Sequence, residues 1–165
     1  MTVLELHSEE ETRELGRALA RVLRAGDLVI LDGPLGAGKT VLAQGIGAAL
    51  GVRGEVTSPT FVIARVHQPG DTMRLPLVHV DAYRLGGIAE IDDLDLDTDL
   101  EHAVTVVEWG EGVAERLADQ HLLIRLRRRD DEVRTCELVG VGGDWPERLA
   151  ASLPFLRPGP AGQVG

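Results

Sequence analysis

The stretch from Gly33 to Thr40, Gly-Pro-Leu-Gly-Ala-Gly-Lys-Thr, decides the fold of this chain. It matches the complete phosphate-loop pattern G-x-x-x-x-G-K-[ST]. A continuous apolar run, Leu28–Leu31, precedes it, and a helix-forming segment, Val41–Leu50, follows it. The glycines let backbone N–H groups surround an anion, and the N-terminus of the next helix adds partial positive charge. A buried strand, a glycine-rich loop and a helix in this order predict a nucleotide-binding α/β fold.

Two side chains of this loop have chemical roles in such a site. Lys39 is expected to reach the β- and γ-phosphates, and the hydroxyl of Thr40 is expected to coordinate magnesium. We therefore expect ATP with Mg²⁺ as the ligand. The absence of a guanine-reading N-K-x-D segment does not by itself decide between ATP and GTP. The residues expected to contact the nucleotide are Leu35, Gly36, Ala37, Gly38, Lys39 and Thr40.

Acidic residues follow two further apolar runs. Asp81 comes directly after Leu77–Val80, and Glu108 comes directly after Val104–Val107. Ligands of α/β sheets bind at the carboxyl ends of strands, and a magnesium site needs a carboxylate. Asp81, Glu108 and Lys39 are therefore the candidate catalytic residues, with a metal-binding or water-positioning role for the two acids. Spacing alone does not say which acid binds metal. His79 fits a structural histidine of the same strand.

The remaining pattern predicts alternating strands and helices first and hairpins later. Ser8 and Glu11 match a capping box that starts a helix reaching about Arg24. The other expected strands are Val3–Leu6, Phe61–Val66, Leu75–Val80, Ala103–Val107, Leu122–Leu126 and Val133–Val139. Further expectations are a turn at Gln68–Asp71, helix and loop over Gly86–Leu100, and helices at Val113–Leu117 and Trp145–Leu153. The predicted fold class is a single-domain α/β, P-loop NTPase-like mixed sheet with flanking helices and a C-terminal hairpin. This domain spans residues 1–153, and a loose tail spans 154–165.

Bulk composition narrows the possible partners. The chain has 165 residues and a formal net charge of -10, which argues against direct grip on a nucleic-acid backbone. The basic run Arg125–Arg129 is short and acidic residues follow it directly in the sequence, so it is interpreted as a solvated hairpin. The lone cysteine, Cys136, fits a small core residue. We see neither a signal peptide nor a membrane span, so a cytoplasmic protein that does not enter a membrane is expected.

Several motifs together resemble one family. After the phosphate loop come Thr57-Ser58-Pro59-Thr60-Phe61, then His79-Val80-Asp81-Ala82-Tyr83-Arg84-Leu85, then Val107-Glu108-Trp109-Gly110-Glu111. By itself, the first of these is either a turn before a strand or a switch that senses the γ-phosphate. At these separations, over about residues 5–139, the set resembles the bacterial TsaE family of small P-loop ATPases.

The resemblance implies a function in tRNA modification. TsaE proteins assist synthesis of threonylcarbamoyladenosine beside the anticodon, acting with the TsaD and TsaB proteins and reaching tRNA only indirectly, through those partners. It implies a magnesium-associated role for Glu108 and a water-positioning role for Asp81. It further implies a switch at Ser58 and Thr60, and a partner or nucleotide surface at Tyr83 and Trp109. The segments that would enclose the base are about Ser8–Thr12 and Arg128–Glu132. Pro34 departs from a frequent acid at a free position of the loop.

Two other functions remain open on the sequence. A small-molecule kinase would need an arginine-rich lid, for which Arg125–Arg129 is the only candidate cluster. A nucleotide switch would need binding without hydrolysis.

Overall fold

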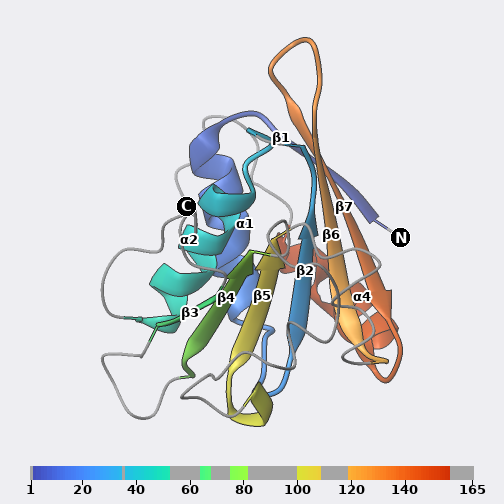
Figure 1. Cartoon of the computed structure of the whole chain (residues 1–165). Helices are drawn as coiled ribbons and strands as arrows, with labels where there is room; N and C mark the ends of the chain where they lie inside the picture. The colour runs from blue at the N-terminus through green and yellow to red at the C-terminus, as the bar shows by residue number, and fades with distance from the viewer. Residues whose placement is uncertain are drawn as a thin grey trace.

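The sheet of this protein is mixed and has seven strands within the described part of the chain, in the order β1-β7-β6-β2-β5-β4-β3 (Figure 1). The computed structural model describes residues 2–34, 36–52, 64–67, 75–81, 100–108 and 119–156. The strands are β1 (Thr2–Leu6), β2 (Leu28–Asp32), β3 (Ala64–His67), β4 (Leu77–Asp81), β5 (Val104–Glu108), β6 (His121–Arg128) and β7 (Arg134–Val141). The helices are α1 (Glu9–Ala20), α2 (Lys39–Leu50), α4 (Trp145–Leu156) and the 3-10 turn η2 (Leu100–His102).

The four central strands run in one direction. β2 pairs in parallel with β5 and β6, and β4 pairs in parallel with β5. The other pairs are antiparallel: β7 with both β6 and β1, and β3 with β4. The carboxyl ends of β2, β4 and β5 therefore meet at one edge of the sheet, where α/β proteins bind their ligands. The β6–β7 hairpin projects beyond the same edge (Figure 1). The mixed α/β architecture predicted from the sequence is confirmed.

The main hydrophobic core lies between the sheet and helices α1, α2 and α4. Alternate strand residues enter it, such as Val29 and Leu31 of β2 and Val104 and Val106 of β5, as the two-residue repeat of a strand requires. Helices α1 and α2 pack closely because glycines face each other: a Cβ at Gly45 would overlap the carbonyl oxygen of Arg13. The core is therefore continuous from the first helix to the helix after the phosphate loop.

Most of the predicted elements within the described residues are confirmed, but two helix ends are wrong. Helix α1 ends at Ala20, not near Arg24, because the backbone N–H of Arg24 donates to the Asp27 carboxylate at 2.6 Å and turns the chain towards β2. Helix α4 continues past Leu153 to Leu156. Burial of the Leu156 side chain in the core offsets the hydrogen bond that proline at position 154 removes.

Some sequence predictions lie outside the described residues. They are Leu35, residues 61–63 of the expected third strand, residues 57–61, 68–71, 86–99 and 113–117, and both Tyr83 and Trp109. Residues 157–165 of the expected tail also lie outside them. Within the described ranges, no helix combines the length and the apolar character needed to cross a membrane.

Candidate functional site

The phosphate-loop residues join β2 to α2, as the sequence predicts. Gly36 and Gly38 have φ values of +83° and +106°, in the left-handed region that favours glycine. Gly33 is confined for a different reason, since a Cβ there would lie 2.5 Å from the carbonyl oxygen of Leu126 on β6. The loop conformation thus depends on Gly33 and Gly38, which the motif specifies, and on Gly36, which occupies a free position of the motif.

The N-terminus of α2 has the features of an anion-binding site. Its N-cap is Gly38, which offers no side-chain hydrogen bond, and its first turn contains no acidic residue. Helix α1 is the opposite case, because Ser8 accepts from the N–H of Glu11 at 3.1 Å and three glutamates occupy its first turn. The first N–H groups of a helix need external acceptors, and the helix dipole favours negative charge there. A phosphate group at the start of α2 would meet both needs, and Lys39, only 6% exposed, adds a cation in that first turn.

Thr40 and Glu108 come together at the carboxyl ends of the strands. The Thr40 hydroxyl donates to Glu108 Oε1 at 3.3 Å, and Glu108 is only 6% exposed. Donation of its proton leaves the lone pairs of the Thr40 oxygen available to a cation. The other carboxylate oxygen, Oε2, lies 2.5 Å from Nε2 of His79.

These oxygen atoms fit a magnesium ion. No group of three His, Cys, Asp or Glu side chains that could hold a metal occurs in the described portion of the chain. Magnesium, however, is commonly held by one or two protein oxygens together with nucleotide phosphates and water. Thr40 and Glu108 lie beside the N-terminus of α2, where such a mode of binding would use their oxygens, and their assignment to magnesium stays a prediction.

Asp81 lies next to Glu108 in the sheet. The two residues are partners in the parallel register of β4 and β5, each at the last position of its strand. The side chain of Asp81 is outside the described part, so its catalytic role remains a prediction.

Asp32 is a third acid at a strand end, and it has a different environment. It closes β2 directly before the loop, yet its carboxylate accepts from Arg127 at 3.3 Å and lies 3.8 Å from Nε of Arg125. Both arginines belong to β6 and share a face of that strand. Asp32 is therefore neutralised by arginines instead of joining Thr40 and Glu108.

Two side chains next to the loop were not singled out by the sequence pattern. A Cβ at Gly38 would lie 3.3 Å from Nε of Arg134 and 3.6 Å from Cγ2 of Thr12. The Arg134 Nε is buried without a hydrogen-bond partner among the described residues. Thr12 falls in the segment that the family resemblance placed near the base, whereas Arg134 lies two residues beyond the other such segment, and no local motif marks it.

Cys136 is unsuited to nucleophilic chemistry. Its side chain is fully buried in the main core, and burial raises the pKa of its thiol to about 12. The prediction of a small core residue is confirmed.

The sequence and the fold of this chain are both similar to those of known proteins. The family model described as "Threonylcarbamoyl adenosine biosynthesis protein TsaE" matches residues 6–136. The tRNA threonylcarbamoyladenosine biosynthesis protein TsaE of Streptomyces coelicolor is 60% identical over 139 residues, which are 81% of this chain and 93% of that protein. Its namesake from Bacillus subtilis is 37% identical over 145 residues, 87% of this chain and 88% of that protein. The crystal structure of Bacillus subtilis YdiB superposes with a TM-score of 0.72 at 28% identity, covering 93% and 94% of the two chains.

Proposed function

This chain belongs to the TsaE family, and from that premise we propose that it binds and hydrolyses ATP with magnesium in support of the threonylcarbamoyl modification of tRNA adenosine. The relatives carry the modification in their names. The observation that carries the nucleotide part is the uncapped, acid-free N-terminus of α2 beside the Thr40–Glu108 pair. Phosphate and magnesium are the ligands that suit these two features together.

Each residue of the site has a distinct task in this proposal. The backbone N–H groups from Gly36 to Thr40 bind the phosphates, and Lys39 holds the β- and γ-phosphates as a point charge. Glu108 accepts a hydrogen bond from the hydroxyl of Thr40 and keeps that hydroxyl oxygen directed towards the metal. Asp81, at the neighbouring strand end, orients the attacking water. A bound magnesium ion supplies neutralisation of the charge that develops on the phosphate oxygens.

The proposed partners are the TsaD and TsaB proteins, and the contact with tRNA is indirect. A net charge of -10 disfavours a direct grip on the tRNA backbone. The basic run at 125–129 does not compensate for this, since all four of its arginines have acidic partners. Arg125, Arg127, Arg128 and Arg129 pair with Asp32, Glu137, Glu132, Asp131 or Glu5. ATP turnover on this chain would therefore serve a reaction that other proteins carry out.

The same ion pairs weaken the alternative of a small-molecule kinase. A phosphoryl-transfer lid presents free guanidinium groups to the donor, whereas Arg127 and Arg128 pair with acids of this chain. Incubation of the protein with ATP and a panel of metabolites tests the point. Rapid transfer of phosphate to a small acceptor without partners would replace the tRNA proposal by the kinase.

Reconstitution with TsaD, TsaB and tRNA tests the main proposal. The readout is the number of modified adenosines per complex, with and without ATP, for the wild type, Lys39→Ala and Glu108→Gln. We expect repeated turnover only with ATP and the wild type, no nucleotide binding by Lys39→Ala, and binding without turnover by Glu108→Gln. Full modification with a Glu108→Gln protein that binds but does not hydrolyse ATP would show that hydrolysis is not required, which is the switch alternative.

A further inference from the structure

His79 makes a direct contact with the acid of the proposed magnesium site. Its side chain is fully buried, and its Nε2 lies 2.5 Å from Oε2 of Glu108. The two oxygens of this carboxylate thus have separate partners, because Oε1 accepts a hydrogen bond from the hydroxyl of Thr40. A histidine in an apolar strand is ordinarily explained as a structural residue, and this contact gives it a more specific task.

We propose that His79 is a positioning residue for magnesium: it fixes one oxygen of Glu108 so that the other faces Thr40. The proposal rests on the magnesium-dependent function proposed above. A glutamate side chain has three rotatable bonds, and a carboxylate held at only one oxygen can still swing. A second hydrogen bond, from a ring that is itself enclosed, restricts that motion. Partners of this kind orient metal-associated carboxylates in many proteins.

The sheet provides the rigid frame that this role requires. His79 is paired in register with Val106 on the neighbouring strand, and Glu108 lies two residues further along that strand. Residues two apart in a strand share a face. The imidazole and the carboxylate therefore meet diagonally across two hydrogen-bonded strands, where the backbone sets their separation. For Nε2 of His79 to donate to Oε2 of an ionised Glu108, that nitrogen has to carry the ring proton.

A binding experiment separates this role from simple core packing. The affinity for a non-hydrolysable ATP analogue is measured by calorimetry in magnesium and in EDTA, for the wild type, His79→Ala and His79→Gln. We expect His79→Ala to lose about tenfold or more of the affinity gained from magnesium, with its affinity in EDTA unchanged. His79→Gln should keep most of the gain, since its amide N–H can still donate to Glu108. The matched control is His121→Gln: His121 is buried at the amino-terminal end of β6, whereas Glu108 lies at the carboxyl end of the parallel strand β5.

The outcomes distinguish the two proposals. A wild-type protein that gains nothing from magnesium would overturn both the magnesium-dependent function and the role of His79. A wild-type gain that His79→Ala retains in full, or that His79→Gln and His121→Gln lose as much as His79→Ala does, would overturn only the role of His79. A nitrogen NMR spectrum of the wild type needs no folded variant: we expect a protonated Nε2 on His79, and an unprotonated Nε2 would refute the proposal.

Discussion

Arg134 of β7 lies against Gly38 at the start of α2, where a Cβ on the glycine would come within 3.3 Å of the arginine Nε. That nitrogen is buried and has no hydrogen-bond partner within the described residues. Arg134 also shares the helix-covered face of β7 with Cys136 and Leu138 of the core. A guanidinium thus borders the position at which α2 would receive phosphate.

Replacement of Arg134 by alanine should weaken nucleotide binding. Hydrogen bonds to charged groups contribute about 1.5–3 kcal/mol, so we expect the ATP affinity of Arg134→Ala to fall by about tenfold or more. Calorimetry measures the change. Arg127→Ala is the matched control, because Arg127 pairs with Asp32 and has a half-exposed side chain. If both variants lost the same ATP affinity, the effect would come from the change in net charge and not from a local contact of Arg134.

The close crossing of α1 and α2 predicts that a glycine-to-alanine change at the crossing lowers the stability of the protein. In an exposed helix, glycine to alanine stabilises by about 1 kcal/mol. At Gly45 the new Cβ would overlap the backbone of Arg13 in α1, so we expect Gly45→Ala to destabilise the protein by about 1–3 kcal/mol. Urea unfolding gives the value. Ala48→Gly, at an exposed position of the same helix, measures the propensity alone. A more stable Gly45→Ala protein would contradict the tight helix crossing.

Arg148 joins α4 to the turn before β2. Its guanidinium forms two hydrogen bonds to Asp27, at 2.7 and 3.1 Å, and the side chains are 9% and 11% exposed. It also donates to the carbonyl oxygen of Val22 and lies 4.0 Å from the centre of the Trp145 ring. The Asp27 carboxylate raises the pKa of Arg148 further, so its charge is permanent.

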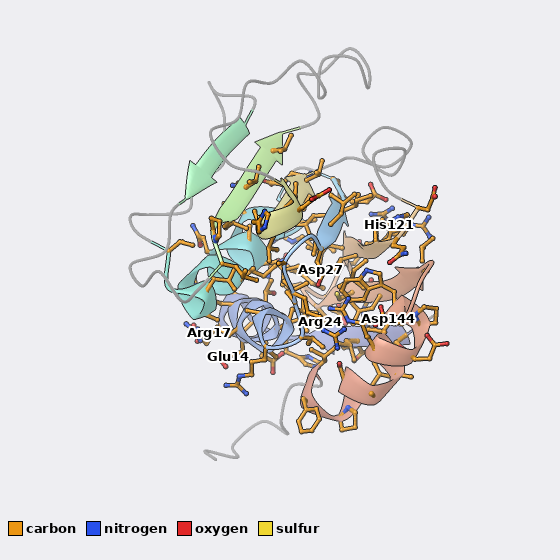
Figure 2. The ribbon with its side chains drawn as sticks, turned by 90° about the horizontal axis from the view of Figure 1, so that it is seen from below. Glu14, Arg17, Arg24, Asp27, His121 and Asp144 are labelled. Atoms are coloured by element: carbon orange, nitrogen blue, oxygen red, sulfur yellow. The ribbon has the colours of Figure 1, made fainter. Side chains whose placement is uncertain are left out.

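Loss of this ion pair should destabilise the fold. Removing one partner of a buried pair costs about 3–5 kcal/mol, which lowers the Tm of a chain of this size by about 6–20 °C. We expect a loss in that range for Arg148→Ala. Arg24→Ala is the control: Arg24 pairs with Asp144 in the same region (Figure 2), but the side chains are 66% and 58% exposed. Arg24→Ala should lower the free energy of unfolding by less than about 1 kcal/mol. Similar Tm values for both variants would contradict the role of the buried pair.

Local sequence pattern predicted the parts of this site that are local. The phosphate loop, its strand and its helix occupy neighbouring positions in the chain, and the motif itself specifies Gly33 and Gly38. The pairing of β4 with β5 is a long-range feature, so the contact between His79 and Glu108 was not predictable from spacing. Nor was the end of α1, since Leu23 continues the apolar repeat of the helix and only the hydrogen bond between Arg24 and Asp27 reveals the turn.

The thiol of Cys136 should be inert in the folded protein. Because burial raises its pKa to about 12, the thiol stays protonated where an ordinary cysteine, with a pKa near 8.5, ionises. A thiol reagent should label it only after unfolding. The pKa of this thiol is higher in the folded state than in the unfolded state. Its contribution to the free energy of unfolding is therefore complete below about pH 8.5 and decreases towards pH 12. The difference in unfolding free energy between the wild type and Cys136→Val, measured from pH 8 to 10, should show this decline, and native labelling at an ordinary rate would contradict it.

Asp32 and Glu108 look alike in the sequence, because each follows a run of buried strand residues. Leu31 is the register partner of Glu108, so Asp32 lies one position beyond that pair and its side chain projects from the other face of the sheet. We therefore expect opposite behaviour from two isosteric changes. Glu108→Gln should lower magnesium-dependent ATP hydrolysis by about tenfold or more, because the amide is a poorer partner for Thr40 and a cation. Asp32→Asn should leave hydrolysis within about twofold and cost only about 1 kcal/mol of stability, because the arginines that pair with the buried Asp32 are themselves 35% and 51% exposed. Phosphate release and urea unfolding on both variants give the comparison. If Asp32→Asn lost hydrolysis as severely as Glu108→Gln while remaining folded, the assignment of the metal-associated acid would have to move to β2.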